Sequence, residues 1–136
     1  LLGHAGSGSG GYVEFVAART ARDLGLDVQV VQRTRDWTDY SLLKDNSVVI
    51  RMAAVSGFRN IQNLVRRHKK DAIGYDFVEV MACPGGCING GGQEAPGGQV
   101  DRAAGRERVR AMEALYRRQP TVEPDAVITR VERVYE

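Results

Sequence analysis

The feature that most constrains this chain is a glycine-rich loop that holds both of its cysteines, Cys83 and Cys87. The preceding run, Asp76–Met81, has the apolar character of a buried strand, so the loop is expected to follow a strand end. Glycine has no Cβ and reaches positive φ without steric cost, so such a loop lets backbone amides approach a bulky group. We expect this conformation at Gly91, among others. A strand followed by two thiols and several glycines predicts a metal site.

Three kinds of site compete for the two cysteines, with buried structural cysteines as a fourth explanation. A disulfide would close a very small loop, and nothing else indicates an exported, disulfide-dense domain. A zinc ion needs two further ligands, but His4 lies in a glycine–serine stretch and His68 near the end of a basic helix. An iron–sulfur cluster takes four thiolates, of which the two cysteines would be half. We favour the iron–sulfur interpretation.

Three segments together resemble a known family. Val80–Gln93, which reads VMACPGGCINGGGQ, is similar to the C-terminal cluster motif of the FeFe-hydrogenase superfamily. That superfamily contains hydrogenases and the hydrogenase-like factors of cytosolic iron–sulfur assembly, including the nuclear prelamin A recognition factor-like proteins. Ser56–Val65 (SGFRNIQNLV) resembles the assembly factors, and Gly8–Glu14 resembles the glycine turn that enters a helix in this superfamily. The resemblance covers residues 6–93 well and residues 100–136 weakly.

The resemblance implies a cofactor and its ligands. In this family pattern, Cys83 and Cys87 both bind a 4Fe–4S cluster, and in hydrogenases the cysteine that matches Cys87 also bridges to a two-iron catalytic centre. The other two cluster ligands would lie outside this chain. Asn89 and Gln93 are expected to form hydrogen bonds within the loop, whereas we interpret Glu79, which alternates with apolar neighbours, as structural.

Two features favour an assembly factor over a hydrogenase. Glu94 follows the motif where hydrogenases usually carry proline, and the segment Gly57–Leu64 has the assembly-factor form. We therefore expect a non-enzymatic factor that passes clusters to apo-protein targets together with other cytosolic assembly proteins. The alternatives are an FeFe-hydrogenase that catalyses reversible hydrogen oxidation and a regulatory iron–sulfur module that binds a partner protein.

Composition sets wider bounds. The chain has 136 residues, 43% of them hydrophobic and 26% charged, which suffices for a core in one domain or one lobe of a larger protein. Its net charge of +2 does not indicate a nucleic-acid partner, and no apolar run approaches the roughly 20 residues that span a bilayer. The chain begins without methionine or a signal segment, so we expect residues 1–136 to be a fragment of a longer protein. Two cysteines that look unpaired, in an iron-binding loop, fit a reducing compartment, so we expect the cytoplasm, with the nucleus as an alternative.

Alternating patterns predict an α/β fold: one lobe of a hydrogenase-like fold, with a mostly parallel sheet flanked by helices. The cluster loop would follow the C-terminal end of a strand, where open α/β sheets bind ligands. Four expectations concern single side chains. Leu24 should lie on the buried face of the first helix, Trp37 in a polar connection, and Met112 and Tyr116 on the inner face of a late helix. The remaining expected elements are a helix from residue 11, a strand over 27–33, a hairpin over 40–53 turning at 45–46, a helix from 58, a helix over 102–118 and a last helix from 121.

Overall fold

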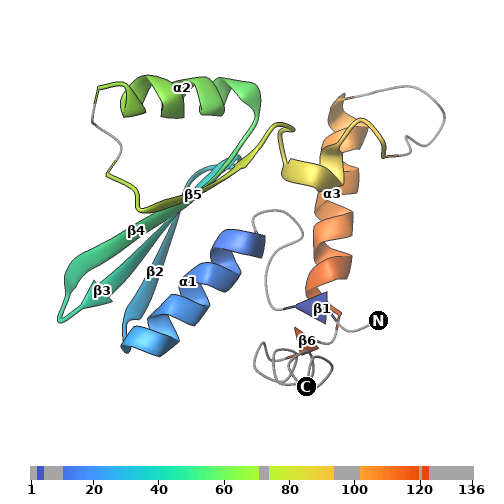
Figure 1. The fold of residues 1–136 in the computed structure, drawn as a ribbon. Coiled ribbons are helices and arrows are strands. Elements are labelled where there is room, and N and C mark those ends of the chain that lie inside the picture. The colour runs from blue at the N-terminus through green and yellow to red at the C-terminus, as the bar shows by residue number, and fades with distance from the viewer. Residues whose placement is uncertain (1–2, 5–10, 71–73, 94–101, 120, 123–136) are drawn as a thin grey trace, which may run out of the picture.

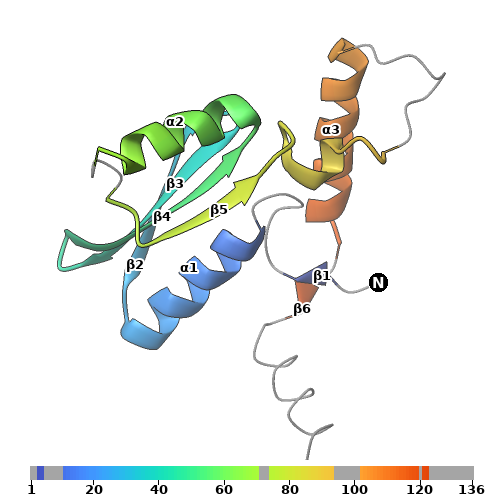
Figure 2. The same cartoon turned by 45° about the horizontal axis from the view of Figure 1, so that its top comes forward.

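The computed structural model describes residues 3–4, 11–70, 74–93, 102–119 and 121–122. Its central feature is a four-stranded sheet with a helix on each face (Figures 1 and 2). The elements in chain order are β1 (Gly3–His4), α1 (Gly11–Leu24), β2 (Asp27–Thr34), β3 (Trp37–Lys44), β4 (Ser47–Ser56), α2 (Phe58–His68), β5 (Phe77–Met81), the 3₁₀ helix η1 (Gly86–Asn89), α3 (Arg102–Arg117) and β6 (Thr121–Val122).

The expected α/β fold is confirmed. The sheet has the order β2-β3-β4-β5, and its strand directions match the expectation of a mostly parallel sheet only in part. β2 pairs with β3 and β3 with β4 in antiparallel fashion, and only β4 with β5 is parallel. Two-residue turns at 35–36 and 45–46 join the first three strands, and turns this short can only join antiparallel neighbours. Asp45 and Asn46 both have positive φ, 50° and 62°, as a tight hairpin turn requires. Parallel pairing begins where the crossover helix α2 separates the two strands.

Each face of the sheet has its own hydrophobic core. On one face, α1 places Val13, Ala17 and Ala21, four residues apart, against a group of sheet residues. On the other face, α2 contributes Leu64 to a second group (Figure 1). The sheet residues of the first core are Tyr40, Leu42 and Met52, and those of the second are Trp37, Ala53 and Val55. The helix starting at residue 11 is thus confirmed, although Leu24 at its end is 58% exposed rather than buried.

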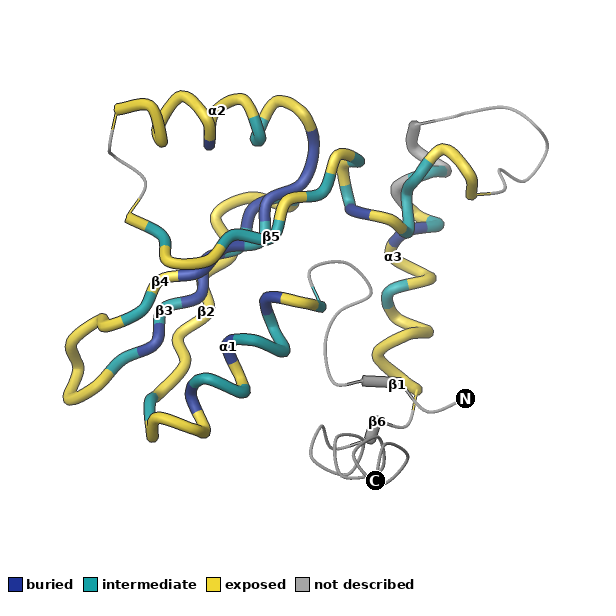
Figure 3. The backbone as a smooth tube through the Cα atoms, viewed as in Figure 1, coloured by how far each residue is buried: buried dark blue, intermediate teal, exposed yellow. Residues whose placement is uncertain are grey.

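β5 was expected to be a buried strand, but it is the last strand of the described sheet and is only partly covered (Figure 3). Phe77 is 37% exposed and Val80 49% exposed. A strand with one neighbour has fewer side chains packed beside it than an inner strand has. The expectation of a strand that leads into the cysteine loop is confirmed, and that of its complete burial is wrong.

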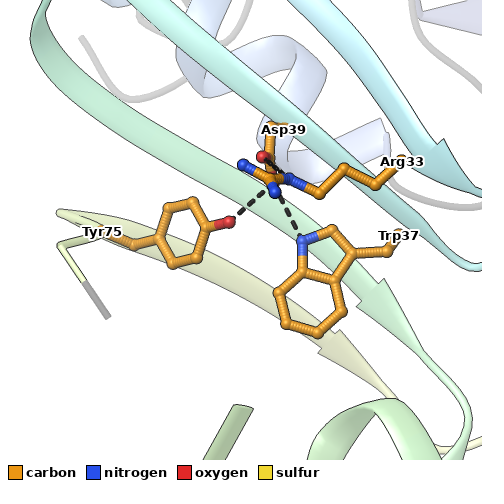
Figure 4. A network of polar contacts seen from close by, with 4 residues as sticks. All are labelled: Arg33, Trp37, Asp39 and Tyr75. Atoms are coloured by element: carbon orange, nitrogen blue, oxygen red, sulfur yellow. Dashed lines mark hydrogen bonds and ion pairs between the residues drawn. The ribbon is translucent and has the colours of Figure 1, made fainter. Parts of the chain in front are cut away.

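Trp37 is the first residue of β3 and is buried, so its expected place in a polar connection was wrong. Its Nε1 donates to Oδ1 of Asp39 at 2.8 Å, and the Tyr75 hydroxyl donates to the same oxygen at 2.7 Å (Figure 4). The Arg33 guanidinium pairs with the other carboxylate oxygen. Three donors therefore compensate the burial of Asp39, which would otherwise be costly. Burial, together with the hydrogen bond to Asp39, raises the pKa of Tyr75.

The C-terminal part agrees with expectation only in part. The helix expected over 102–118 is α3, and Val109 is buried on it. Met112 and Tyr116, expected on the inner face, are 47% and 37% exposed. The expected last helix is not present at its start, because Thr121–Val122 forms β6, which pairs in parallel with β1. The rest of that expected helix, from residue 123, lies outside the described residues.

Tyr40 gives the fold a dependence on alkaline pH. Its hydroxyl donates to Oε1 of Glu14 at 3.3 Å, and burial, followed by the charge of that carboxylate, raises the pKa of Tyr40 far above its ordinary value of 10. Above pH 10 the unfolded chain loses the phenol proton of Tyr40, while the folded chain keeps it. Stability from this group is therefore complete below pH 10 and decreases above it, by up to about 1.4 kcal/mol per pH unit.

We expect Tyr40→Phe to flatten this alkaline decrease in the free energy of unfolding, measured by urea titration between pH 8 and pH 11. Tyr12→Phe is the matched control, because Tyr12 is 78% exposed at the start of the same helix, and this variant should keep the decrease. An unchanged slope in the Tyr40→Phe protein would contradict the assignment.

Candidate iron–sulfur site

The cysteine loop begins as a tight turn directly after β5. The Gly86 N–H donates to the carbonyl oxygen of Cys83 at 2.9 Å and closes a four-residue turn. Proline stands at its second position, and Gly85 at its third has φ 76° and ψ 6°, the values of a type II turn. Pro84 and Gly85 are therefore residue types that this turn favours, and Cys83 stands at its first position.

Cys87 follows in η1, one residue after the turn ends. Cys83 is half-buried, Cys87 is exposed, and both are free thiols. The structure therefore has no disulfide bond between Cys83 and Cys87. Two thiols four residues apart, presented by one turn and one 3₁₀ helix, are open to a metal at the end of β5.

Polar side chains stiffen the loop from within. The Asn89 side-chain amide donates to the Pro84 carbonyl at 2.9 Å, and the Gln93 amide donates to the Cys87 carbonyl at 3.3 Å. The Gly90 N–H also donates to the Cys87 carbonyl, at 3.1 Å. The expectation that Asn89 and Gln93 form hydrogen bonds within the loop is confirmed.

The loop is also fixed to the start of α2. The Gly57 N–H donates to the Met81 carbonyl at 2.9 Å, directly after Ser56, which pairs with Met81 at the end of β4 and β5. Gly57 has φ 82°, and a Cβ there would lie 3.4 Å from the Pro84 side chain. This close approach places the first turn of α2 against the cysteine turn.

α3 covers the loop from a third side (Figure 2). Val109 is 1% exposed, and a Cβ built on Gly85 would lie 3.6 Å from its Cγ1. The site is therefore built from the end of β5, the start of α2 and the middle of α3.

The structure adds a residue that the sequence did not indicate. Asp36, in the turn between β2 and β3, accepts the Gly85 N–H on its Oδ1 at 2.7 Å and the Ser56 hydroxyl on the same oxygen at 3.0 Å. The sequence signal for this contact is weak, because an aspartate in a tight turn is ordinary and its partner is 49 residues away.

Glu79 has the structural role that was expected. Its Oε2 accepts the Val13 N–H at 2.9 Å, in the first turn of α1. A carboxylate at this end of a helix satisfies a backbone donor that lacks an intrahelical partner and matches the helix dipole. Glu79 thereby ties α1 to β5, two residues before the strand ends.

The donor set fits half of an iron–sulfur site. Thiolates are the ligands that such clusters take, and a tetra-iron cluster takes four. Within the described ranges, no group of three or more histidine, cysteine, aspartate or glutamate side chains is arranged to hold a metal ion. Cys83 and Cys87 would hold one edge of a cluster, and the remaining ligands would come from elsewhere.

Comparison with known proteins assigns the class. Residues 2–91 match the family described as iron only hydrogenase large subunit, C-terminal domain, and the chain belongs to this family. Its fold resembles that of an FeFe-hydrogenase studied for oxygen inactivation, with a TM-score of 0.60 and 23% identity over 99% of this chain and 40% of that one. For the FeFe-hydrogenase HydA1 of Chlamydomonas reinhardtii, the TM-score is 0.51 and the sequence identity is 24%, over 82% of this chain and 35% of that one. At these identities the likeness concerns the fold.

Curated relatives are more similar in sequence. The chain is 45% identical to the cytosolic Fe-S cluster assembly factor narfl of Danio rerio, over 92% of this chain and 31% of that protein. It is 47% identical to cytosolic iron-sulfur assembly component 3 of Pongo abelii, over 83% and 24%. It is 43% identical to the nuclear prelamin A recognition factor of Xenopus laevis, over 90% of this chain and 27% of that protein. The chain thus spans about a quarter to a third of the length of these relatives. In the part of the chain that the structure describes, the helices are too short or too polar to cross a membrane.

The loop glycines differ in what they require, and this corrects the expectation for Gly91. Gly85 and Gly86 have positive φ, whereas Gly91 does not and has no atom within 4 Å of a built Cβ. We expect Gly85→Ala to lower stability by about 1–2 kcal/mol, because a Cβ is strained in the left-handed region. Gly91→Ala is the control and should be near neutral. Urea unfolding of both variants tests this, and equal midpoints would contradict the assigned turn.

Proposed function

We propose that Cys83 and Cys87 are two of the four ligands of a 4Fe–4S cluster, and that the complete protein acts in cytosolic iron–sulfur cluster assembly. The observation that carries the proposal is the pair of free thiols in a hydrogen-bonded loop at the end of β5. The family and the names of the relatives at 43–47% identity support it. The remaining two ligands would come from outside this chain.

The chemistry assigned to the chain's own residues is ligation and orientation. Both cysteines bind as thiolates, and the type II turn and η1 fix their spacing. When bound, the cluster supplies redox-active iron and exchangeable sulfide. Because Cys87 is exposed, this side of the site is open to a partner. The proposed partners are other assembly proteins and the apo-proteins that receive clusters, in the cytosol; nuclear location remains a prediction.

We expect the complete protein, reconstituted with iron and sulfide under anaerobic conditions, to show the broad visible absorption of a 4Fe–4S cluster. Cys83→Ser and Cys87→Ser should each remove most of it, because serine is a much poorer ligand for iron at these positions. Ala82→Ser is the matched control, since it adds a hydroxyl on an exposed neighbour and keeps both thiols. Full iron retention in the double cysteine variant would disprove the ligand assignment.

A second experiment separates the assembly function from hydrogenase activity, which the fold likeness brings into consideration. We expect neither hydrogen turnover nor infrared bands of carbon monoxide and cyanide ligands in the protein purified anaerobically with hydrogenase maturation proteins. Cells depleted of the protein should lose activity in cytosolic iron–sulfur enzymes. The sequence basis is Glu94 after the glycine motif and the Gly57–Leu64 segment. Carbonyl bands or measurable turnover would instead identify a hydrogenase.

A further inference from the structure

We propose that Asp36 is the positioning residue of the cysteine loop. Its carboxylate holds the turn that begins at Cys83 in the position for cluster binding. Its negative charge lowers the reduction potential of the bound cluster. The inference rests on the proposed function for its effect on the cluster. Its effect on the loop itself depends only on the contacts of this chain.

Asp36 connects four parts of the structure through two of its oxygens. Its Oδ1 accepts the Gly85 N–H at 2.7 Å and the Ser56 hydroxyl at 3.0 Å. Its main-chain carbonyl accepts the Ser56 N–H at 2.9 Å and the Asn60 side-chain amide at 3.4 Å. The β2–β3 turn, the end of β4, the first turn of α2 and the cysteine loop therefore meet at one residue.

The bond to Gly85 is the one that matters for the cysteines. Gly85 is the third residue of the turn that starts at Cys83. The Gly85 N–H is not the donor that closes this turn, and it donates to a carboxylate instead. A hydrogen bond to a charged acceptor is shorter and stronger than one between neutral groups. Removing Asp36 would leave the turn closed by its own hydrogen bond but without its bond to the β2–β3 turn.

Asp36 would also place a negative charge near a cluster bound by the two cysteines. Its carboxylate contacts the backbone of Gly85, which lies two residues from each cysteine. Reduction adds an electron to the cluster, and a nearby negative charge disfavours this step. Asparagine at position 36 offers an oxygen that can accept both hydrogen bonds but carries no charge. Asp36→Asn therefore separates the charge from the positioning, and Asp36→Ala removes both.

The chain offers a matched control at the other end of β5. Asp76 precedes the strand and accepts the Arg51 N–H on its Oδ2 at 2.8 Å, a side-chain to backbone bond like that of Asp36 with Gly85. The five residues of β5 separate it from the cysteine loop. Asp76→Ala and Asp76→Asn therefore test the loss of a comparable bond and of a comparable charge away from the site.

The first measurement is hydrogen exchange of the Gly85 amide in the complete protein without its cluster. We expect Asp36→Ala to accelerate this exchange roughly tenfold or more, since the bond lost is charge-assisted. Asp36→Asn should stay within a few-fold of wild type, and Asp76→Ala should leave Gly85 unchanged. Exchange in Asp36→Ala equal to wild type, or in Asp36→Asn as fast as in Asp36→Ala, would overturn the positioning role. If the alanine variant does not fold, Asp36→Gly takes its place, because glycine is accepted in tight turns and also lacks the carboxylate.

The second measurement is made on the cluster-loaded protein. Asp36→Ala should lose iron to a chelator several times faster than wild type, whereas Asp36→Asn should retain it and show a higher reduction potential. Asp76→Asn should leave the potential unchanged. An unshifted potential in Asp36→Asn would overturn the electrostatic part. If wild-type protein binds no cluster, the proposed function fails, while the exchange experiment still decides whether Asp36 holds the loop.

Discussion

The placement of the cysteine loop depends on the parallel pairing of β4 with β5. Backbone pairing sets Ser56 beside Met81 and continues to the hydrogen bond between Gly57 and the Met81 carbonyl. Because β4 and β5 run in the same direction, α2 and the cysteine loop both start at the same end of the sheet, where these two strands terminate. The contacts of the loop with Asp36 and with α3 are made at this end of the sheet.

The contacts made at this end of the sheet also explain how a short, glycine-rich loop can hold two thiols in an ordered arrangement. Glycine-rich segments carry a large conformational entropy in the unfolded state, and ordering them costs free energy. Here the cost is offset by hydrogen bonds from Asn89 and Gln93 inside the loop, by the Asp36 bond from outside, and by burial against Val109. Side-chain contacts thus hold the loop in one arrangement, although its own composition favours flexibility.

Local chemistry made much of this architecture predictable. Asp45–Asn46 is a turn because both residues tolerate positive φ, and Gly57 separates β4 from α2 for a similar reason. The β2–β3 turn at 35–36 has no glycine or proline, so it was not recognised from the sequence. For this reason Trp37 was placed in a connection. Without this turn, which makes β2 and β3 antiparallel, the sheet was expected to be mostly parallel. The Asp36 contact joins residues 49 apart, and no periodicity or motif encodes such a pairing. The cysteines were found from their spacing and neighbours, and their role as ligands remains a prediction.

The two hairpins have a consequence for the order in which the lobe folds. β2, β3 and β4 are neighbours in sequence as well as in space, so their contacts close short loops and form early at little entropic cost. The β5 pairing and the anchoring of the cysteine loop need contacts between distant segments and should form late. We therefore expect a nascent chain to have a stable hairpin scaffold before its thiols reach their final places. Metal capture would then be a terminal step of maturation, after most of the core has formed.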